Sequence, residues 1–440
     1  MSNPFLPLWE YIPDGEPRVF GDRVYIYGSH DRAASSSFCD FKLKVWSASV
    51  DNLNDWVCHG DIFHTRPDED HIADVDYTQK ELFAPDVVEK DGKYYLYAYI
   101  VGAKGCVAVS DKPEGPFKFI SQYKYNIESH YDNGTFIDPG VLVDDGRVFV
   151  YCGYLGSYMC EIDGNTMTNV IDNTYKLDII PTSEEENGFF EGCSLRKVGD
   201  KYYFIYSPKI GSRLDYAIGD SPTGPFKYMG TIIDNGINFP GGNDHGSICN
   251  IKGKWYIFYH RMTNNTIMSR RACVERIEIL EDGSIPQVEM TSLGFEESLS
   301  PYKIINADIA CYLTGGCFIN EKNVFTRVVT NITNGCVIGY KYFDFGEDFS
   351  SKTMEFTANI KGFGAKAKMR IMIDSPDGEK IGEINIGTDD AVITSRVKSV
   401  IGRHSIFFLI EDGHDAEGEF FQGLFKGRQL FELVSFVFMK

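Results

Sequence analysis

The chain lacks a cysteine pairing motif, a long apolar run and an excess of basic residues. Its eleven cysteines include no C-x-x-C pair, and the odd, scattered count favours reduced thiols. Residues 1–13 have neither a basic start nor a sustained apolar stretch, so they do not resemble a signal peptide. No later run is long enough to cross a membrane. We therefore expect a cytoplasmic protein with no membrane partner.

The charge balance excludes a second class of partner. The net charge is −20 and the isoelectric point is about 4.9, and such a field repels nucleic acid and anionic membrane. A neutral ligand such as a sugar is not penalised. Hydrophobic residues make up 43% of the 440 residues and charged residues 24%, which is typical of a soluble globular protein of two or three domains.

Amphipathic helices are absent from residues 1–300, and a repeat takes their place. A turn glycine, a charged residue and an aromatic or β-branched run recur at Gly21–Tyr27, Gly92–Tyr97, Gly146–Tyr151, Gly199–Tyr206 and Gly253–Tyr259. The glycines are 71, 54, 53 and 54 positions apart. Strand-rich units of this length are typical of propeller blades, whereas chance self-similarity in a β-sandwich would not give nearly equal spacings. The sequence predicts a five-bladed β-propeller over residues 1–298.

A polar residue precedes each repeat glycine by six to eight positions, on the strand that would line the propeller axis. These residues are Asp14, Asp86, Asp138, Glu191 and His245. We expect them to converge on one funnel. Carboxylates crowded together cannot all ionise, so their pKa values must separate, as a general acid and a general base require.

Each of these residues also has a structural interpretation. Asp86 can cap a turn, and we assign it that role; Asp14 and Asp138 adjoin prolines and could be turn residues, although function is favoured. Glu191 lies between aromatics and a glycine, where a carboxylate is poor for stability and function explains it better. For His245, a hydrogen-bonded core residue and a functional residue are equally good interpretations.

Three motifs together resemble glycoside hydrolase family 43, whose members are five-bladed propellers with an inverting mechanism. The motifs are Asp14 with the following Val24–Asp31, Phe136–Val141 around Asp138, and Glu191-Gly192. The resemblance implies that Asp14 is the general base and Glu191 the general acid. Asp138 would orient the substrate, and its negative charge would raise the pKa of Glu191.

The resemblance also implies three substrate-binding residues. Phe83 stands where the family often has tryptophan, and could form an apolar wall of the sugar pocket. His245 matches an axial histidine near which some relatives hold calcium or water. Of the adjacent pair Arg270 and Arg271, the spacing favours Arg271 as the substrate-binding arginine. No cofactor is required by this mechanism, and calcium beside His245 is the one metal implied.

The expected function is inverting, exo-acting hydrolysis that releases xylose or arabinose from short plant-derived arabinoxylo-oligosaccharides. The oligosaccharide substrate is the only partner expected. The alternative is a propeller that binds carbohydrate without cleaving it; a missing carboxylate would favour that alternative, but all three motif positions are acidic.

Residues 299–440 alternate short apolar runs with turn residues, which predicts a β-sandwich. The stretches Ile338–Gly346 and Asp374–Gly382 resemble family 6 carbohydrate-binding modules, and this resemblance implies a jelly roll. All four tryptophans lie before this region, and Tyr340 and Tyr342 on alternate strand positions are more typical of a core. We therefore expect a structural companion rather than a strong sugar platform.

Overall fold

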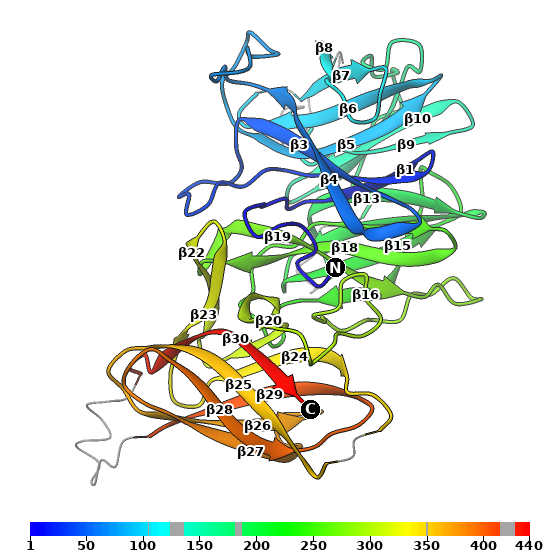
Figure 1. Cartoon of the computed structure of the whole chain (residues 1–440). Helices are drawn as coiled ribbons and strands as arrows, with labels where there is room; N and C mark the ends of the chain where they lie inside the picture. The colour runs from blue at the N-terminus through cyan, green and yellow to red at the C-terminus, as the bar shows by residue number, and fades with distance from the viewer. Residues whose placement is uncertain (104, 124–135, 181–186, 349–350, 414–426) are drawn as a thin grey trace.

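The computed structural model describes residues 1–103, 105–123, 136–180, 187–348, 351–413 and 427–440. Within these ranges the chain is almost wholly β-structure, with one short 3-10 turn, η1 (Ala307–Ile309) (Figure 1). The prediction of an all-β chain is confirmed. No helix in the described part of the chain is long and apolar enough to span a membrane.

Five antiparallel sheets follow one another from residue 16 to residue 277 of the described chain, each built from consecutive strands. The first holds β1 (Glu16–Phe20), β2 (Arg23–Tyr27), β3 (Lys42–Ser49) and β4 (Asn52–His64), and the second β5 (Leu82–Lys90), β6 (Lys93–Ile100), β7 (Cys106–Ser110) and β8 (Lys118–Gln122). The third holds β9 (Gly140–Asp144), β10 (Arg147–Gly153), β11 (Ser157–Ile162) and β12 (Lys176–Leu177). The fourth holds β13 (Phe189–Val198), β14 (Lys201–Pro208), β15 (Arg213–Gly219) and β16 (Phe226–Asp234), and the fifth β17 (Ser247–Ile251), β18 (Lys254–Thr263) and β19 (Thr266–Ile277).

The repeated phrase marks the same turn in every sheet, the one between its first and second strands. The five repeat glycines all have a positive φ, from 58° at Gly199 to 82° at Gly253. Residues with a side chain rarely adopt this conformation, so each glycine permits a tight hairpin, and the apolar run after it enters the core as the second strand. The hairpins predicted from the repeat are confirmed.

The first strands of the five sheets form a closed ring. β1 contacts β5 and β17, β5 contacts β9, and β13 contacts both β9 and β17. The N-terminal segment completes the fifth sheet along β19: Phe5 N donates to Ala272 O at 3.2 Å, and Asn3 exchanges hydrogen bonds with Val274 at 2.8 and 2.9 Å. Four-stranded sheets arranged in this way fit the blades of a propeller.

Asp86 has a structural role, but its carboxylate links three of these sheets, a wider role than the turn cap assigned to it. Its buried carboxylate accepts hydrogen bonds from Arg18 Nε on β1 at 2.9 Å and from Val141 N on β9 at 2.8 Å. Because a buried charge must be paired, this contact fixes β5 between its neighbours.

The C-terminal region consists of two antiparallel sheets that lie beneath the others in Figure 1. One contains β20 (Ile305–Asn306), β22 (Phe318–Asn323), β23 (Thr326–Ile332), β25 (Thr353–Gly362), β28 (Ala391–Lys398) and β30 (Phe431–Met439). The other contains β21 (Tyr312–Thr314), β24 (Val337–Asp344), β26 (Ala367–Ile373), β27 (Glu379–Ile386) and β29 (Arg403–Asp412).

Aromatic side chains join these two sheets. Phe408 of β29 packs against Phe356 of β25 and Phe436 of β30, with ring centroids 5.6 and 5.0 Å away. Tyr340 is fully buried in the same core, so it offers no sugar platform, as expected. The Arg403 guanidinium lies over the Tyr342 ring, 4.0 Å from the centroid of that ring.

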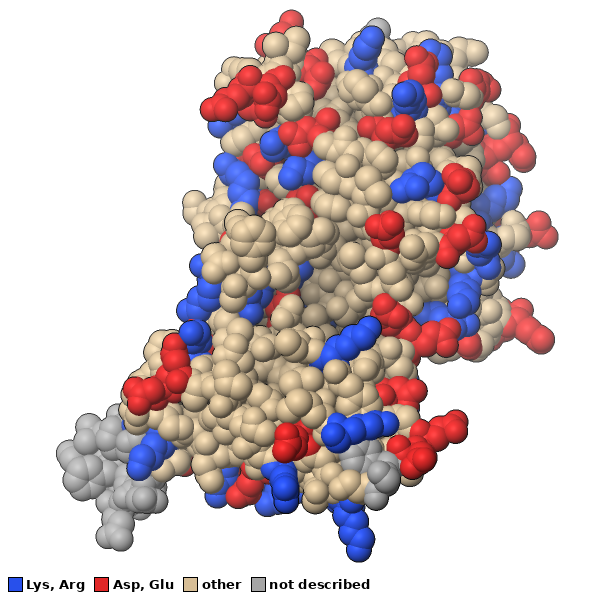
Figure 2. Space-filling model, in the orientation of Figure 1, with Lys and Arg blue, Asp and Glu red and all other residues tan. Residues whose placement is uncertain are grey.

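The C-terminal sheets share one continuous hydrophobic core with the fourth and fifth sheets. Polar contacts reinforce this junction: Leu313 N donates to Asn238 O at 2.7 Å, and Arg271 Nη1 lies 3.2 Å from Asp308 Oδ2. Both members of the Arg271–Asp308 pair are buried. Acidic and basic residues are interspersed on the face shown in Figure 2, so on this face the net charge of −20 is not confined to one patch.

We predict that a chain ending at Pro301 is less stable than the full chain. The truncation removes Asp308 and leaves the buried Arg271 guanidinium unpaired, a change that typically costs about 3–5 kcal/mol, and it exposes the shared core. We expect a melting temperature lower by at least about 5 °C or a loss of soluble protein. Circular dichroism melting checks this. Unchanged melting with loss of polysaccharide binding would instead identify the C-terminal region as a sugar-binding module.

Candidate active site

A cavity of about 100 Å³ opens where the five sheets meet. It is lined by Asp14, Phe38, Cys39, Phe83, Asp138, Glu191, Asn243, His245 and Arg270. Every one of the five sheets, or the loop that enters it, contributes at least one lining residue. The structure thus brings together five of the six predicted site residues, and Arg271 is the one it does not place there.

The backbone has a positive φ at, or directly after, each of the three carboxyl residues of this cavity. Asp14 and Asp138 have φ values of 57° and 48°, and Gly192, directly after Glu191, has 74°. Each aspartate lies two positions before the first strand of its sheet, so this turn conformation sets the direction of its side chain. A side chain on Gly192 would lie 3.2 Å from the His245 ring. Strained backbone of this kind clusters at functional sites.

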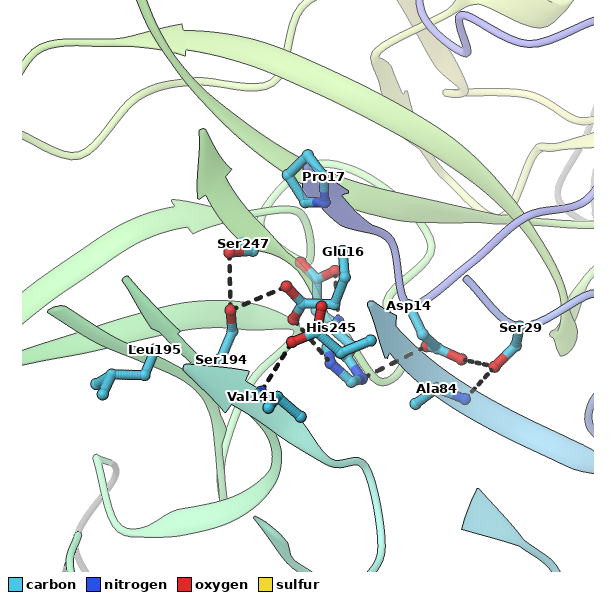
Figure 3. A network of polar contacts seen from close by, with 12 residues as sticks. Asp14, Glu16, Pro17, Ser29, Ala84, Val141, Ser194, Leu195, His245 and Ser247 are labelled. Atoms are coloured by element: carbon cyan, nitrogen blue, oxygen red, sulfur yellow. Dashed lines mark hydrogen bonds and ion pairs between the residues drawn. The ribbon is translucent and has the colours of Figure 1, made fainter. Parts of the chain in front are cut away.

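Asp14 is held as a carboxylate by its hydrogen bonds. Ser29 Oγ donates to it at 2.6 Å, and Ala84 N donates to Ser29 Oγ at 2.7 Å (Figure 3). Arg270 Nη1 also donates to Asp14, at 2.8 Å. Burial alone would raise the pKa of Asp14, but the charge of Arg270 and the Ser29 hydrogen bond bring the pKa below its usual value. Asp14 is therefore ionised and able to accept a proton.

Arg270, and not Arg271, is the arginine at the cavity. Its guanidinium is fixed by Asp31, with Nε 2.9 Å from Oδ2 and Nη2 3.0 Å from Oδ1. Successive residues of a strand point to opposite faces, so on β19 only one of the pair can face the axis. Arg271 points the other way, toward Asp308 and Leu6 O. The assignment of Arg271 to the substrate pocket was wrong.

Glu191 and Asp138 differ from Asp14 in holding protons more tightly. Burial, followed by the charge of Asp14, raises the pKa of Glu191 to about 7, against the opposing effects of Arg270 and Asn243. Burial, and then the charges of Glu191 and Asp14, raise the pKa of Asp138 well above its usual value. We expected the charge of Asp138 to raise the pKa of Glu191. Instead the charge comes from Asp14, because Asp138 itself tends to be protonated.

His245 lies between two carboxylates on the axis. Its Nδ1 is 3.9 Å from Asp14 Oδ1, and its Nε2 is 3.9 Å from Glu16 Oε1 (Figure 3). Burial lowers the pKa of His245, so the ring is neutral. Its Nε2 and Glu16 Oε1 are both buried and have no hydrogen-bond partner in the described residues. A water molecule or a cation that contacts both atoms would satisfy them.

Aromatic rings form the apolar side of the cavity. Phe83 and Phe38 meet edge to face with centroids 6.4 Å apart, and the Arg270 guanidinium lies 5.0 Å from the centroid of Phe38. Phe38 and Cys39 were not predicted, because they lie in a loop between β2 and β3 outside the repeated phrase. Asn243 was not predicted either; it lies two residues before His245, and its interaction with Glu191 marks it as a site residue.

The family model of glycosyl hydrolases family 43 matches residues 2–285, the part of the chain that builds this cavity. The chain belongs to glycosyl hydrolase family 43. It is 37% identical over 400 residues to a protein named "Xylosidase/arabinosidase" from Thermoclostridium stercorarium, covering 78% of this chain and 82% of that protein. As a member of this family with relatives of this kind, the protein is a glycosidase.

Two solved structures show the same fold. A family 43 enzyme from Xanthomonas citri complexed with xylotriose is 26% identical, with a TM-score of 0.57 over 66% of this chain and 93% of that one. An arabinoxylan arabinofuranohydrolase from Bacillus subtilis is 22% identical, with a TM-score of 0.55 over 100% of this chain and 97% of that one. Because the second match covers the whole chain, the likeness in fold includes the C-terminal sheets.

The separated pKa values predict the pH dependence of this family 43 enzyme. Glu191 must be protonated to act as an acid, so kcat/KM should fall as pH rises through about 7. Asp14 must be ionised, and because its pKa is lowered, activity should persist down to the acidic end of the usual aspartate range. A pH–rate profile on xylobiose, whose leaving group needs the proton from Glu191, checks both limbs.

The arginine assignment predicts different effects for two adjacent substitutions. Arg270→Met removes the cation that keeps Asp14 ionised, so the acidic limb should move to higher pH and kcat should fall by about 10²-fold or more. Arg271→Met is the matched control; it should lower the melting temperature and leave the pH limbs in place. Identical pH profiles for the two variants would refute the assignment.

Proposed function

We propose that this protein is an inverting, exo-acting β-xylosidase or α-L-arabinofuranosidase that releases xylose or arabinose from short arabinoxylo-oligosaccharides. The observation that carries the proposal is the pairing of an ionised Asp14 with a protonated Glu191 in one cavity. The names of the relatives and the xylotriose complex of the Xanthomonas citri enzyme support the substrate class. A binding protein without catalysis would not need carboxyl groups with opposed pKa shifts.

The proposed reaction is a single displacement. Asp14 accepts a proton from water while the water oxygen bonds to the anomeric carbon, and Glu191 donates its proton to the departing glycosidic oxygen. The bond between that oxygen and the anomeric carbon breaks in the same step. Inverting enzymes keep the two carboxyl groups about 6.5–9.5 Å apart to admit the water. Asp138 and Arg270 would hold the sugar hydroxyls.

The small cavity supports an exo mode. It encloses about 100 Å³ and has Phe38 and Phe83 on one side, a shape that suits one sugar unit better than a long chain.

A calcium ion near His245 and Glu16 would keep most of its water and would supply positive charge near the base. The two unpaired atoms provide only two of the six to eight ligands that calcium takes.

We further propose that residues 1–298 form a five-bladed propeller domain and residues 299–440 a jelly-roll sandwich of the family 6 carbohydrate-binding type. The ring of first strands and the two facing C-terminal sheets support this division. No cysteine of the described chain forms a disulfide and Cys58 alone is exposed there, which supports a reducing, cytoplasmic environment.

We predict that Glu191→Gln removes most activity on natural linkages and less on substrates with an activated leaving group. The amide cannot donate a proton, and a nitrophenolate leaves without one. Kinetics on xylobiose and on nitrophenyl xyloside measure the two losses. Glu275→Gln is a matched control, because burial also raises the pKa of Glu275 to about 7, but Glu275 bonds to Thr291 outside the cavity. Equal losses on both substrates for Glu191→Gln would reject it as the acid.

We predict that the first product is a monosaccharide of inverted anomeric configuration. Direct attack by water inverts the anomeric carbon, and a single-unit cavity shortens or debranches the chain one sugar at a time. Proton NMR during hydrolysis of linear and branched arabinoxylo-oligosaccharides reports both properties. Retention would contradict the roles of Asp14 and Glu191, and early oligomers of mixed length would contradict the exo mode.

A further inference from the structure

A second cluster of polar groups lies where β4 ends and the chain turns toward β5. Asp61 and His64 are on β4, and Asp68 and His71 are on the loop that follows. One donor atom from each residue can be chosen so that all four lie within 4.8 Å of one another. None of these residues lines the active-site cavity, so the cluster has no part in the proposed hydrolysis.

His64 provides a nitrogen, Nε2, that could bind a metal ion at the centre of this cluster. Its side chain is 5% exposed, and its Nε2 lies 3.4 Å from Asp61 Oδ2 and 3.8 Å from Asp68 Oδ2. Nε2 has no hydrogen-bond partner in the described residues. A buried nitrogen in this position is unfavourable unless another group satisfies it.

The second ring nitrogen of His64, Nδ1, lies near a carboxylate. Asp74 Oδ2 lies 3.7 Å from His64 Nδ1 and accepts a hydrogen bond from the His64 backbone N at 2.7 Å. A carboxylate on the far nitrogen of an imidazole fixes the ring and increases its basicity, as is usual behind histidines that bind metals. Asp74 therefore directs Nε2 toward Asp61 and Asp68.

The second histidine makes the cluster accessible. The His71 ring stacks on the His64 ring with centroids 4.4 Å apart and planes at 19°. His71 and Asp68 are 43% and 39% exposed, so the cluster opens to solvent on their side. An ion could enter there and keep a water ligand.

The charge of the cluster favours a cation. Three carboxylates, of Asp61, Asp68 and Asp74, surround the two histidines, and the Lys42 ammonium is the one lysine or arginine cation paired with them among the described residues. Lys42 Nζ lies 2.8 Å from Asp61 Oδ2 and 3.8 Å from Asp68 Oδ2. Lys42 is flexible and partly exposed, so a divalent ion could displace its ammonium group.

We propose that Asp61, His64, Asp68 and His71 form a structural site for a divalent transition metal of the zinc type. Two imidazoles and two carboxylates suit zinc, whereas calcium and magnesium prefer sites made only of oxygen. The ion would join the end of β4 to the loop that leads into β5. Because β5 carries Phe83, the site would hold one wall of the active cavity in place.

Binding of Zn²⁺ and Co²⁺ to the full chain, after treatment with a chelator, tests this proposal. The protein should carry the Cys58→Ser substitution, because Cys58 is the one exposed thiol. We expect one Zn²⁺ per chain, a higher melting temperature with Zn²⁺ than with Ca²⁺, and visible Co²⁺ bands without sulfur charge transfer.

Variants at the exposed positions separate a metal site from a simple ion-pair cluster. Asp68→Asn and His71→Gln should each weaken Zn²⁺ binding by about tenfold or more, whereas Asp70→Asn, in the same loop, should not. Lys42→Met should tighten binding, because it removes the competing ammonium. The proposal is overturned if Zn²⁺ does not bind at 100-fold excess over protein, or if it binds equally well to Asp68→Asn and His71→Gln.

Discussion

The buried guanidinium of Arg270 is the interaction on which the active site depends. It pairs with Asp14 before β1 and with Asp31 after β2, and it comes from β19 in the last of the five sheets. A buried charge is tolerated only when it is paired, so this contact ties the end of the ring to its beginning. The same contact keeps Asp14 ionised, which connects closure of the fold with the state of the proposed base.

The distribution of arginines along the axis explains why the carboxyl groups differ. Arg270 pairs with Asp14 and Arg18 with Asp86, but neither Asp138 nor Glu191 has an ion-pair partner among the described residues. Burial therefore dominates at Asp138 and Glu191 and raises the pKa of each, and the charge of Asp14 raises them further. One cation among three carboxyl groups is thus sufficient to give a base and an acid.

The sequence was informative where a feature repeats and uninformative where it occurs once. The turn glycines Gly21 to Gly253 have a physical requirement for positive φ, so their spacing located five hairpins. An offset of seven or eight positions from these glycines then located Asp14, Asp138, Glu191 and His245. The direction of Arg270 depends on the register of β19 against β18, which no local motif specifies. The Asp68 and His71 loop lies between repeats, so its approach to His64 could not be predicted.

The junction between the two regions shows why Arg271 could be mistaken for a site residue. Both arginines are buried charges on β19, and each needs a carboxylate, but the strand directs them to opposite sides. Arg270 finds its partners on the axis, whereas Arg271 finds Asp308 within the 3-10 turn of the C-terminal region. A single strand therefore serves two purposes, because its inward face sets the charge of the active site and its outward face anchors the C-terminal sheets. Loss of the C-terminal region would consequently disturb β19, and through it the arginine that holds Asp14 ionised.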